Sequence, residues 1–546
     1  MADLPYGARV GMEPVRVRLA ICANGDADSC KISFDPKEGV HSHELAEVTF
    51  SFDGEVAEVT IIPAVPLTLV GYQFELRHAF SGEEQMLLNG YQSWTDTVER
   101  SPWARMRGLR GVPSPLVNRW VLDGGGDYRF HDYAIARGRQ HGYTSATVRR
   151  GEGMVLVGSL NSNRGWTKIS VEAQHGRVLL ETECPLTPLP AGKPYAIGRY
   201  AITRGVLEEC YDRYFELLGV AARTKRKLVG YSSWYRHYND IDEEKLAADL
   251  AGEVASLPPL LAELPDEAAE PLIPLFQIDD GYCKVGDWLD IDTEKFPNGV
   301  APLARAARNV GFLPGLWIAP FVCERGSRIF TEHNEWLLRD EQGNPVPTGS
   351  HWTGGFALDT RNTEVRTYVL EVLQTMVEDW GFGLLKMDFL YAACLLPHDG
   401  LNRGQLMGDA IDLLRTGAGD DCLILGCGVP LAPAFGKFDF CRIGCDVGLD
   451  WDDALHMRLL HRERVSTKNS LANTYGRAPL DGRAFGNDPD VFFLRKDVRL
   501  KQDQRDELLF ADADLGSVFL TSDDMGAWDD AQLDRYRTAL KLFAEK

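Results

Sequence analysis

From Lys227 onward, short apolar segments alternate with segments of helical periodicity, and this alternation constrains the fold more than any other feature. Helical spacing is clear in Glu244–Ala255, Ala301–Asn309, Glu364–Trp380, Gly404–Thr416, Asp452–Val465 and Asp530–Phe543. The strand candidates are LVGYSSW, PLFQIDDGY, LPGLWIAPF, LLKMDFLY, CLILGCG, FDFCRIGCD and SVFLTSDD, with a weaker one at Ser470–Tyr475. Strands that alternate with helices favour a parallel sheet, and about eight such units predict a closed (β/α)8 TIM barrel.

Nearly every one of these apolar segments ends in polar or aromatic residues. The residues at these ends are Trp234, Asp279, Asp280, Trp317, Lys386, Asp388, Cys427, Arg442, Asp446 and Asp523. In a (β/α)8 barrel the carboxyl ends of the strands form the active-site face, so we expect these side chains to converge on one bowl. Strands of any α/β protein end in polar loop residues, but that explains one or two cases rather than so many.

The chain before this region reads as β-structure. Segments rich in β-branched residues and bounded by Gly, Asp, Asn and Pro occur at Glu47–Ser51, Val56–Ile62, Leu67–Leu76, Thr144–Val148, Met154–Ser159 and Arg177–Thr182. Few helical patterns interrupt them, so a large antiparallel sandwich is expected. An amphipathic helix at Val206–Leu218 ends this region. We therefore expect one domain at 1–222 and a second at 223–546, packed together because no flexible linker separates them.

Composition excludes several classes of partner. The 546 residues carry a formal net charge of −22, which repels a phosphate backbone, so nucleic acid is not expected as a partner. No apolar run reaches the ~18 residues of a spanning helix, and the first residues, MADLPYGARVGMEP, lack a signal-peptide core, so no membrane association is expected. The eleven cysteines include no CxxC pair, which fits reduced thiols and a cytoplasmic location. The oligomeric state stays unknown.

LLKMDFL carries the sharpest chemical signal. Lys386 and Asp388 are two residues apart at the end of an apolar strand, so they share one strand face. A nearby ammonium lowers the pKa of a carboxylate and keeps it ionised, which suits Asp388 as a nucleophile. A structural Lys–Asp ion pair that closes a strand fits the motif equally well.

A second carboxylate follows two βα units later, in FCRIGCD. There Arg442 and Asp446 end a strand, so Asp446 is expected to face Asp388 across the bowl. Retaining glycosidases need two carboxyl groups about 5–5.5 Å apart, one as nucleophile and the other as a protonated acid that later acts as base. RIGCD alone is weak evidence for this chemistry.

IDDGY places Asp279 and Asp280 at a third strand end. Adjacent acids bind vicinal sugar hydroxyls or a metal ion, but no suitably placed histidines accompany them, so no metal and no other cofactor is expected. Apolar sugar faces stack on aromatic rings, for which Trp234 and Trp317 are the best placed. There is no P-loop, Rossmann fingerprint, GxSxG elbow or HExxH motif, and Cys427 has no nearby histidine to activate it.

In their order along the chain, the motifs resemble those of glycoside hydrolase family 36. They are NGYQSW (Asn89–Trp94), GYSSWY, QIDDGY, GLWIAPF, LKMDFLYA, LGCGVPLAPA, RIGCD and GNDPD, and they are most similar to the shorter α-galactosidases typified by thermophilic bacterial enzymes. The resemblance implies an N-terminal antiparallel β-supersandwich followed by a (β/α)8 barrel. It also implies hydrolysis of terminal α-D-galactosides, on an oligosaccharide or glycoside substrate, by double displacement without a metal.

The resemblance implies a role for each matched residue. Asp388 would be the nucleophile and Asp446 the acid/base. Trp94, in NGYQSW, would reach over from the sandwich and close one side of the pocket. The residues that bind substrate, with the paired aspartates at O4 and O6 of galactose, would be Asp279, Asp280, Lys386, Arg442, Trp234, Tyr235, Trp317, Cys427 and Trp94.

Two features depart from the family pattern. Cys445 stands where relatives commonly carry proline, directly before Asp446, which puts the loop of the acid/base in question. Relatives also continue into a C-terminal β-domain, and this domain is expected to be absent because the chain ends at Lys546, soon after the SVFLTSDD segment and one helix.

Two other functions stay open. An α-N-acetylgalactosaminidase, or another α-glycosidase on the same scaffold, differs in the room beside the sugar C2 and in the groups that meet O4, which a sequence does not fix. A non-catalytic sugar-binding protein is a different class, and loss of a catalytic carboxylate would favour it. Both carboxylates are present here.

Overall fold

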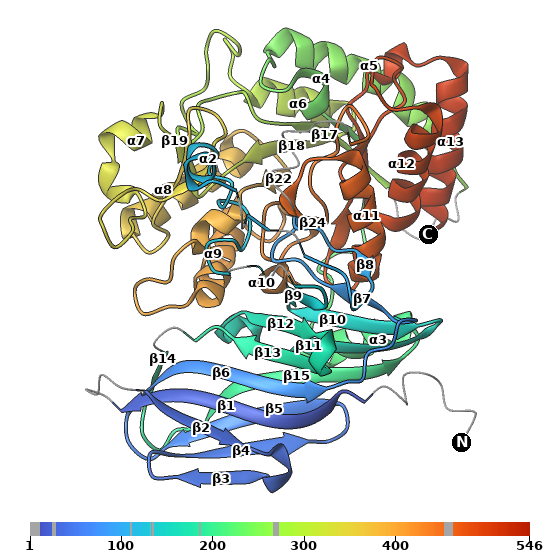
Figure 1. The fold of residues 1–546 in the computed structure, drawn as a ribbon. Coiled ribbons are helices and arrows are strands. Elements are labelled where there is room, and N and C mark those ends of the chain that lie inside the picture. Colours follow the sequence, from blue (N-terminus) through green and yellow to red (C-terminus); the bar gives the residue numbers. More distant parts are fainter. Residues whose placement is uncertain are drawn as a thin grey trace.

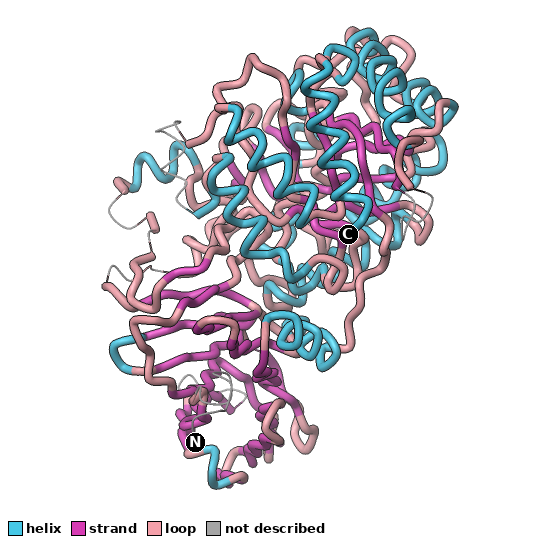
Figure 2. Tube along the Cα trace, turned by 90° about the vertical axis from the view of Figure 1, so that its right-hand side faces the viewer, coloured by secondary structure: helices cyan, strands magenta, loops and turns pink. Residues whose placement is uncertain are grey.

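The computed structural model describes residues 11–23, 29–106, 108–109, 112–131, 133, 136–184, 187–265, 272–452 and 462–546. Two parts of different architecture pack against each other, a β-rich part and a part in which strands alternate with helices (Figure 1). Figure 2 shows that strands dominate the first part, whereas helices surround the strands of the second. The expected combination of antiparallel β-structure with a parallel α/β region is confirmed.

In the described ranges, the first part consists mainly of two antiparallel sheets. Their strands are β1 (Glu13–Ala23), β2 (Cys30–Phe34), β3 (Val40–His43), β4 (Ala46–Phe52), β5 (Val56–Pro63), β6 (Leu67–Arg77), β7 (Gln85–Leu88), β8 (Glu99–Arg100), β9 (Arg139–Tyr143), β10 (Ser145–Arg150), β11 (Gly153–Ser159), β12 (Thr167–Glu172), β13 (Arg177–Thr182), β14 (Thr187–Leu189) and β15 (Tyr195–Gly205). One sheet has the order β2-β1-β6-β13-β12-β9, with β14 beside β6, and the other has the order β3-β4-β5-β15-β11-β10-β7-β8. Every strand expected here is present, with bounds shifted by at most two residues.

The period-two pattern of these strands builds one shared core. In β5, Ala57, Val59 and Ile61 are buried and alternate with more exposed residues. They belong to the same apolar cluster as Val17 and Phe74 of the other sheet, so the two sheets pack face to face.

A linking helix, α3 (Leu207–Leu218), follows β15 and agrees with the expected helix to within one residue. Its buried face includes Cys210, Tyr214 and Phe215, and the hydroxyl of Tyr214 donates to the carbonyl of Ser159 at 2.9 Å. Gly219 ends the helix in the left-handed conformation that glycine adopts readily. The helix is therefore fixed to the β-rich part.

Among the residues that the structure describes, nine strands form one parallel sheet in the second part. They are β16 (Lys227–Ser232), β17 (Leu272–Ile278), β18 (Leu313–Ile318), β22 (Leu384–Met387), β23 (Leu423–Gly426), β24 (Phe440–Arg442), β25 (Gly486–Asp488), β26 (Val491–Phe492) and β27 (Val518–Thr521). Their order is β25-β24-β23-β22-β18-β17-β16-β27-β26, and each neighbouring pair is parallel. Only Pro489 and Asp490 separate β25 from β26, so both ends of this curled sheet lie on one short segment.

Helices connect these strands and cover the sheet. They are α4 (Trp234–His237), α5 (Glu243–Leu261), α6 (Ala301–Asn309), α7 (Arg328–Glu332), α8 (Thr363–Gln374), α9 (Arg403–Ala418), α10 (Leu431–Ala434), α11 (Thr467–Arg477), α12 (Gln502–Leu515) and α13 (Asp530–Glu545). A small antiparallel sheet, β19 (Val322–Glu324), β20 (Pro347–Gly349) and β21 (Gly355–Ala357), lies between β18 and α8 along the chain. The expected helix at Asp452–Val465 lies largely outside the described residues.

The weak strand predicted at Ser470–Tyr475 is wrong, because this segment belongs to α11. The hydroxyl of Ser466 accepts from the backbone N–H of Asn469 and caps the helix. Ser470, Leu471 and Thr474 are buried at helical spacing, but most of the buried side chains are polar, so no apolar period marks the helix. The strand position is taken instead by β25 and β26.

Within the described residues, no helix combines the length and apolar character needed to cross a bilayer. The eleven cysteines are all free thiols, and most of them are buried. This agrees with the expectation that the thiols are reduced.

Candidate active site

A cavity of about 750 Å³ lies at the carboxyl ends of the parallel strands. Of the predicted site residues, those that line it are Trp94, Trp234, Tyr235, Asp279, Asp280, Trp317, Lys386, Asp388 and Asp446. Two others, Arg442 and Cys427, are buried behind this lining. The structure therefore brings most of the predicted residues together in one cavity.

Asp388, the expected nucleophile, follows β22 and is held by two N–H groups. The indole Nε1 of Trp317 donates to its Oδ2 at 3.1 Å, and the backbone N–H of Phe389 donates to its Oδ1 at 2.7 Å. Phe389 has a φ of 53°, a left-handed conformation that is rare for bulky residues and recurs at functional sites. Asp388 is 8% exposed, so its carboxylate is fixed at the cavity wall.

Burial raises the pKa of Asp388 above its ordinary value. The Lys386 ammonium lowers this pKa, while the negative charge of Asp446 raises it, and burial remains the largest influence. Lys386 was expected to keep the pKa of Asp388 low. That expectation is wrong, because the net shift of this pKa is upward. The Lys386 ammonium forms its ion pair with Asp279 Oδ2 at 2.8 Å, and its effect on Asp388 does not outweigh burial.

Asp446, the expected acid/base, is the more open of the two carboxylates. Its side chain is 39% exposed, and its Oδ1 accepts from Nη1 of Arg442 at 2.9 Å. The preceding Cys445 is buried, and its sulfur accepts from Nδ2 of Asn469 at 3.4 Å. A thiol packed on α11 thus supports the loop that carries Asp446.

Arg442 binds three carboxylates behind the cavity. Besides Asp446, it donates to Asp490 at 2.8 Å from Nη2 and to Asp488 at 3.3 Å from Nε. Burial, opposed by the Arg442 cation, raises the pKa of Asp490 to about 7. In this structure the guanidinium holds Asp446 and lies behind the residues that line the cavity.

Asp279 and Asp280 have different environments although they are adjacent. Asp279 Oδ2 accepts from Lys386 at 2.8 Å and from the Gln277 amide at 2.7 Å. Asp280 Oδ2 accepts from the Trp352 indole at 2.7 Å and from the Asn239 amide at 2.8 Å. Burial raises the pKa of Asp280 to about 6, although the Trp352 hydrogen bond opposes the shift. The pair thus presents carboxyl oxygens whose orientation is fixed by neighbouring donors.

Trp94 reaches the cavity from the β-rich part, as expected. Its indole Nε1 donates to Cys427 Sγ at 3.2 Å, and its ring lies edge-on to Phe389 at 5.1 Å between centroids. Cys427 is therefore the acceptor behind Trp94, and burial raises the pKa of its thiol well above the ordinary value.

A buried arginine joins the loop of Trp94 to the second part. Arg477 of α11 donates to the carbonyls of Gln92 and Ser93, and also to the carbonyl of Ile443, which follows β24. The Arg477 guanidinium thus binds both the loop that carries Trp94 and the segment that follows β24.

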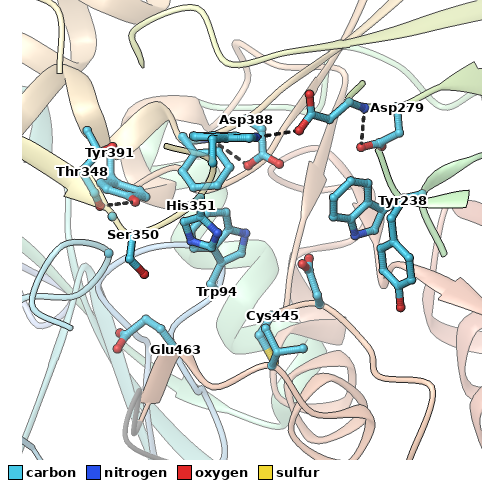
Figure 3. A pocket seen from close by; sticks show the side chains of 18 of the residues that line it. Trp94, Tyr238, Asp279, Thr348, Ser350, His351, Asp388, Tyr391, Cys445 and Glu463 are labelled. Atoms are coloured by element: carbon cyan, nitrogen blue, oxygen red, sulfur yellow. Dashed lines mark hydrogen bonds between the residues drawn. The ribbon is translucent and has the colours of Figure 1, made fainter. Parts of the chain in front are cut away.

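Several residues of the cavity were not predicted. They are Tyr238, Asn239, Thr348, Ser350, His351, Trp352, Phe389, Tyr391 and Glu463. Figure 3 shows Asp388 and Asp279 on one side of the cavity, Cys445 and Glu463 on the facing side, and His351 and Trp94 between them in this view. Most of these residues lie in loops, so a search for polar residues at the ends of predicted strands does not identify them.

Three comparisons relate the chain to known proteins. The family model described as Melibiase matches residues 258–393. Alpha-galactosidase 2 of Pediococcus pentosaceus is 30% identical over 119 residues, which are 20% of this chain and 16% of that protein. Alpha-galactosidase AgaA of Geobacillus stearothermophilus is 24% identical over 176 residues, 31% of this chain and 21% of that protein. The matches thus span about a fifth of the length of these curated relatives.

Solved structures match over much more of the chain. TtGalA, an α-galactosidase from Thermus thermophilus in complex with p-nitrophenyl α-D-galactopyranoside, is 26% identical with a TM-score of 0.70, over 92% of this chain and 94% of that one. Its complex with stachyose has a TM-score of 0.71 over 92% and 99%. AgaA from Geobacillus stearothermophilus is 13% identical, with a TM-score of 0.59 over 94% and 68%, and supports the fold alone. The expected resemblance to family 36 glycoside hydrolases is confirmed.

Within the described residues, no group of three or more His, Cys, Asp or Glu side chains is placed to hold a metal ion.

Proposed function

We propose, from the likeness of this chain to family 36 glycoside hydrolases, that it is a retaining exo-α-galactosidase that hydrolyses terminal α-D-galactosides. One observation carries the proposal. A buried carboxylate, Asp388, is fixed by two N–H donors in the same cavity as a half-exposed carboxylate, Asp446, that an arginine holds. Double displacement needs this division between a rigid nucleophile and an acid/base that meets the leaving group and water.

The reaction follows in two steps. Asp388 attacks the anomeric carbon of galactose while the bond to the leaving oxygen breaks, and Asp446 gives its proton to that oxygen. In the second step Asp446 takes a proton from water, the water oxygen attacks the anomeric carbon, and the bond to Asp388 breaks. Two inversions leave the released galactose with the α configuration of the substrate.

The remaining roles follow from position in the cavity. Asp279 and Asp280 bind galactose hydroxyls, with Lys386 beside them, because each presents oriented polar atoms at the cavity wall. The aromatic rings of Trp234, Tyr235, Trp317 and Trp94 surround the apolar face of the sugar. Arg442 and Cys427 lie behind the cavity lining. Arg442 positions Asp446 by donating to it, and Cys427 positions Trp94 by accepting from its indole N–H.

The same proposal includes the architecture. We assign the curled parallel sheet to a (β/α)8 barrel of residues 223–546, in which β25 and β26 are one interrupted strand. Residues 1–222 form the β-supersandwich domain with its linking helix. The likeness to TtGalA over 92% of the chain supports this assignment. A cytoplasmic location and the absence of a cofactor stay predictions.

The test is release of nitrophenol from para-nitrophenyl α-galactoside, with the α-GalNAc and α-glucoside analogues alongside. Wild type is expected to cleave the galactoside, whereas Asp388→Ala is inactive until azide replaces the missing nucleophile and gives β-galactosyl azide. Turnover of the α-GalNAc substrate alone would indicate an α-N-acetylgalactosaminidase. Galactose binding without turnover of any substrate would indicate a sugar-binding protein and contradict the proposal.

A further inference from the structure

The turn between β20 and β21 contributes an aromatic residue, Trp352, to the cavity lining. Trp352 has a φ of 54°, in the left-handed region that bulky residues rarely adopt. Backbone strain of this kind persists only where the surrounding structure fixes it, and it recurs at functional sites. The strained turn therefore indicates that the direction of the Trp352 side chain matters to the site.

Contacts with β19 hold this turn in place. The backbone N–H and the hydroxyl of Thr353 donate to Glu324 Oε2, at 3.3 Å and 2.7 Å, and the backbone N–H of Arg325 donates to the carbonyl of Gly354 at 3.0 Å. The Glu324 carboxylate also accepts from the backbone N–H of Val285 at 3.2 Å, which ties the turn to the segment that follows β17. The turn thus has a fixed position before a substrate binds.

The Trp352 ring lies between a proposed sugar-binding carboxylate and the supports of the nucleophile. Its indole Nε1 donates to Asp280 Oδ2 at 2.7 Å. Its centroid lies 5.0 Å from the ring of Phe389 and 6.2 Å from that of Trp317. Those two residues supply the N–H groups that hold Asp388. One side chain thus contacts Asp280 and both residues that fix the nucleophile.

Two side-chain donors meet the same oxygen of Asp280. Besides the Trp352 indole, the amide of Asn239 donates to Oδ2 at 2.8 Å. Two separate segments therefore fix the rotation of the carboxyl group, and with it the direction of Oδ1. Burial raises the pKa of Asp280 to about 6, and the Trp352 hydrogen bond is the largest influence that opposes the shift. Such a bond favours the ionised form, which accepts from hydroxyl groups.

We propose that Trp352 is a positioning residue of the galactose site, which orients the Asp280 carboxyl group toward the hydroxyls of the sugar. This role rests on the proposed function, in which Asp279 and Asp280 bind galactose. Trp352 acts through Asp280, because it fixes a group that would otherwise have to be ordered when the sugar binds.

The experiment is a double-mutant cycle of Trp352→Phe and Asp280→Asn, measured as kcat/KM for para-nitrophenyl α-galactoside. Trp352→Phe keeps an aromatic ring and removes the N–H. We expect kcat/KM to fall about tenfold, the effect of losing one hydrogen bond to a charged group. In the Asp280→Asn background we expect the same substitution to change kcat/KM less than about threefold, because the indole then meets a neutral group.

The pH dependence gives a readout that a loss of packing would not move. Removal of the indole donor raises the pKa of Asp280 above about 6, so the acidic limb of the kcat/KM profile is expected to move to higher pH. In the Asp280→Asn background this group no longer titrates, so Trp352→Phe is expected to leave the limb in place.

Trp288→Phe is the matched control. The Trp288 ring also packs against Trp317, at 5.8 Å between centroids, but its Nε1 meets no acceptor among the described residues. The same ring is exchanged without loss of a bond to a carboxylate, and we expect the acidic limb to lie at the wild-type pH.

The outcomes separate the role of Trp352 from the reaction. An equal loss from Trp352→Phe in both backgrounds, or a loss without a shift of the acidic limb, would overturn the positioning role and leave the galactosidase assignment intact. If wild type cleaves no galactoside but binds galactose, the proposed function is wrong, and the same cycle measured as dissociation constants for galactose tests Trp352. A protein that neither cleaves galactosides nor binds galactose would overturn both. Thermal unfolding midpoints close to that of wild type are expected, because Trp352 is only partly buried.

Discussion

Asp490 accepts a hydrogen bond from Nη2 of Arg442 at 2.8 Å, behind the proposed acid/base. The same Asp490 carboxylate accepts from the backbone N–H of Val447 at 2.9 Å and from the hydroxyl of Tyr235. Arg442 in turn donates to Asp446 at 2.9 Å. Asp490 thus fixes Asp446 from two directions, through the arginine and through the backbone of the next residue.

Asp490→Asn is expected to impair proton donation to the leaving group. An amide keeps the shape of the carboxylate but has one acceptor oxygen, so it loses at least one of the bonds to Arg442, Val447 and Tyr235. For substrates with sugar leaving groups we expect kcat/KM to fall about 10- to 100-fold, because part of the general acid catalysis by Asp446 is lost. With 2,4-dinitrophenyl α-galactoside, whose leaving group departs without a proton, we expect little change. Steady-state kinetics across leaving groups measures this difference.

Asp488→Asn is the control for that variant. Asp488 also binds Arg442, at 3.3 Å from Nε, but its other oxygen accepts from the backbone N–H of Asp490. This substitution also replaces a carboxyl group beside the same arginine with an amide, and we expect a smaller dependence on the leaving group. An Asp490→Asn variant that loses the same factor on every substrate would contradict a role in positioning Asp446.

Trp317→Phe is expected to slow formation of the galactosyl-enzyme. The phenyl ring keeps most of the packing but removes the N–H that donates to Asp388 Oδ2 at 3.1 Å. Loss of a donor to the ionised form raises the pKa of Asp388 further, so the acidic limb of the kcat/KM profile is expected to move to higher pH. Trp336→Phe, which removes an indole donor to Glu364 outside the cavity, should leave the profile unchanged. If the acidic limb of Trp317→Phe lies at the same pH as that of wild type, the Trp317 N–H does not lower the pKa of Asp388, contrary to the prediction.

Strand-end patterns predicted the centre of the site because the carboxyl ends of parallel strands meet at one edge of a sheet. Asp388 and Asp446 follow β22 and β24, so a correct strand assignment was enough to place both in one cavity. His351, Trp352 and Glu463 lie in connections, and they reach the cavity only through packing that no local pattern records.

Burial accounts for the two errors. The segment Ser470–Tyr475 belongs to α11, whose buried side chains are mostly polar. A search for apolar residues at helical spacing therefore does not detect this helix. Lys386 stands two residues before Asp388 as expected, yet the pKa of Asp388 is raised because burial outweighs the ammonium. The burial of a side chain depends on the tertiary structure. A sequence can therefore identify charged residues close to an ionisable group, but not whether the pKa of that group is raised or lowered.

Arg477→Met is expected to destabilise the joint between the two parts. Arg477 is fully buried, burial lowers its pKa to about 9, and it donates to backbone carbonyls of Gln92, Ser93 and Ile443. Methionine leaves the carbonyls of Ser93 and Ile443 without this donor, so we expect the free energy of unfolding to fall by about 3 kcal/mol or more. Urea denaturation measures this loss.

The control for that variant is Arg535→Met on α13, where the arginine is 38% exposed and pairs with Asp506. We expect its unfolding free energy to stay within about 0.5 kcal/mol of wild type. Equal effects of the two arginine substitutions would mean that the Arg477 contacts contribute nothing specific.

Glu463→Gln is expected to stabilise the protein relative to wild type increasingly as the pH rises above about 4.5. Glu463 Oε1 accepts from the hydroxyl of Thr95 at 2.7 Å, and burial, opposed by the Arg462 cation, raises the Glu463 pKa to about 7 from an ordinary value of 4.5. Because the folded pKa is the higher one, the stabilising contribution of the neutral acid is fully present below pH 4.5 and is lost as pH rises through 7. Glutamine stays neutral, so the unfolding free energy of the variant relative to wild type should rise by up to about 3 kcal/mol between pH 4.5 and about pH 8. Urea denaturation at several pH values tests this, and a difference that does not vary with pH would mean that Glu463 ionises in the folded protein as readily as in the unfolded chain.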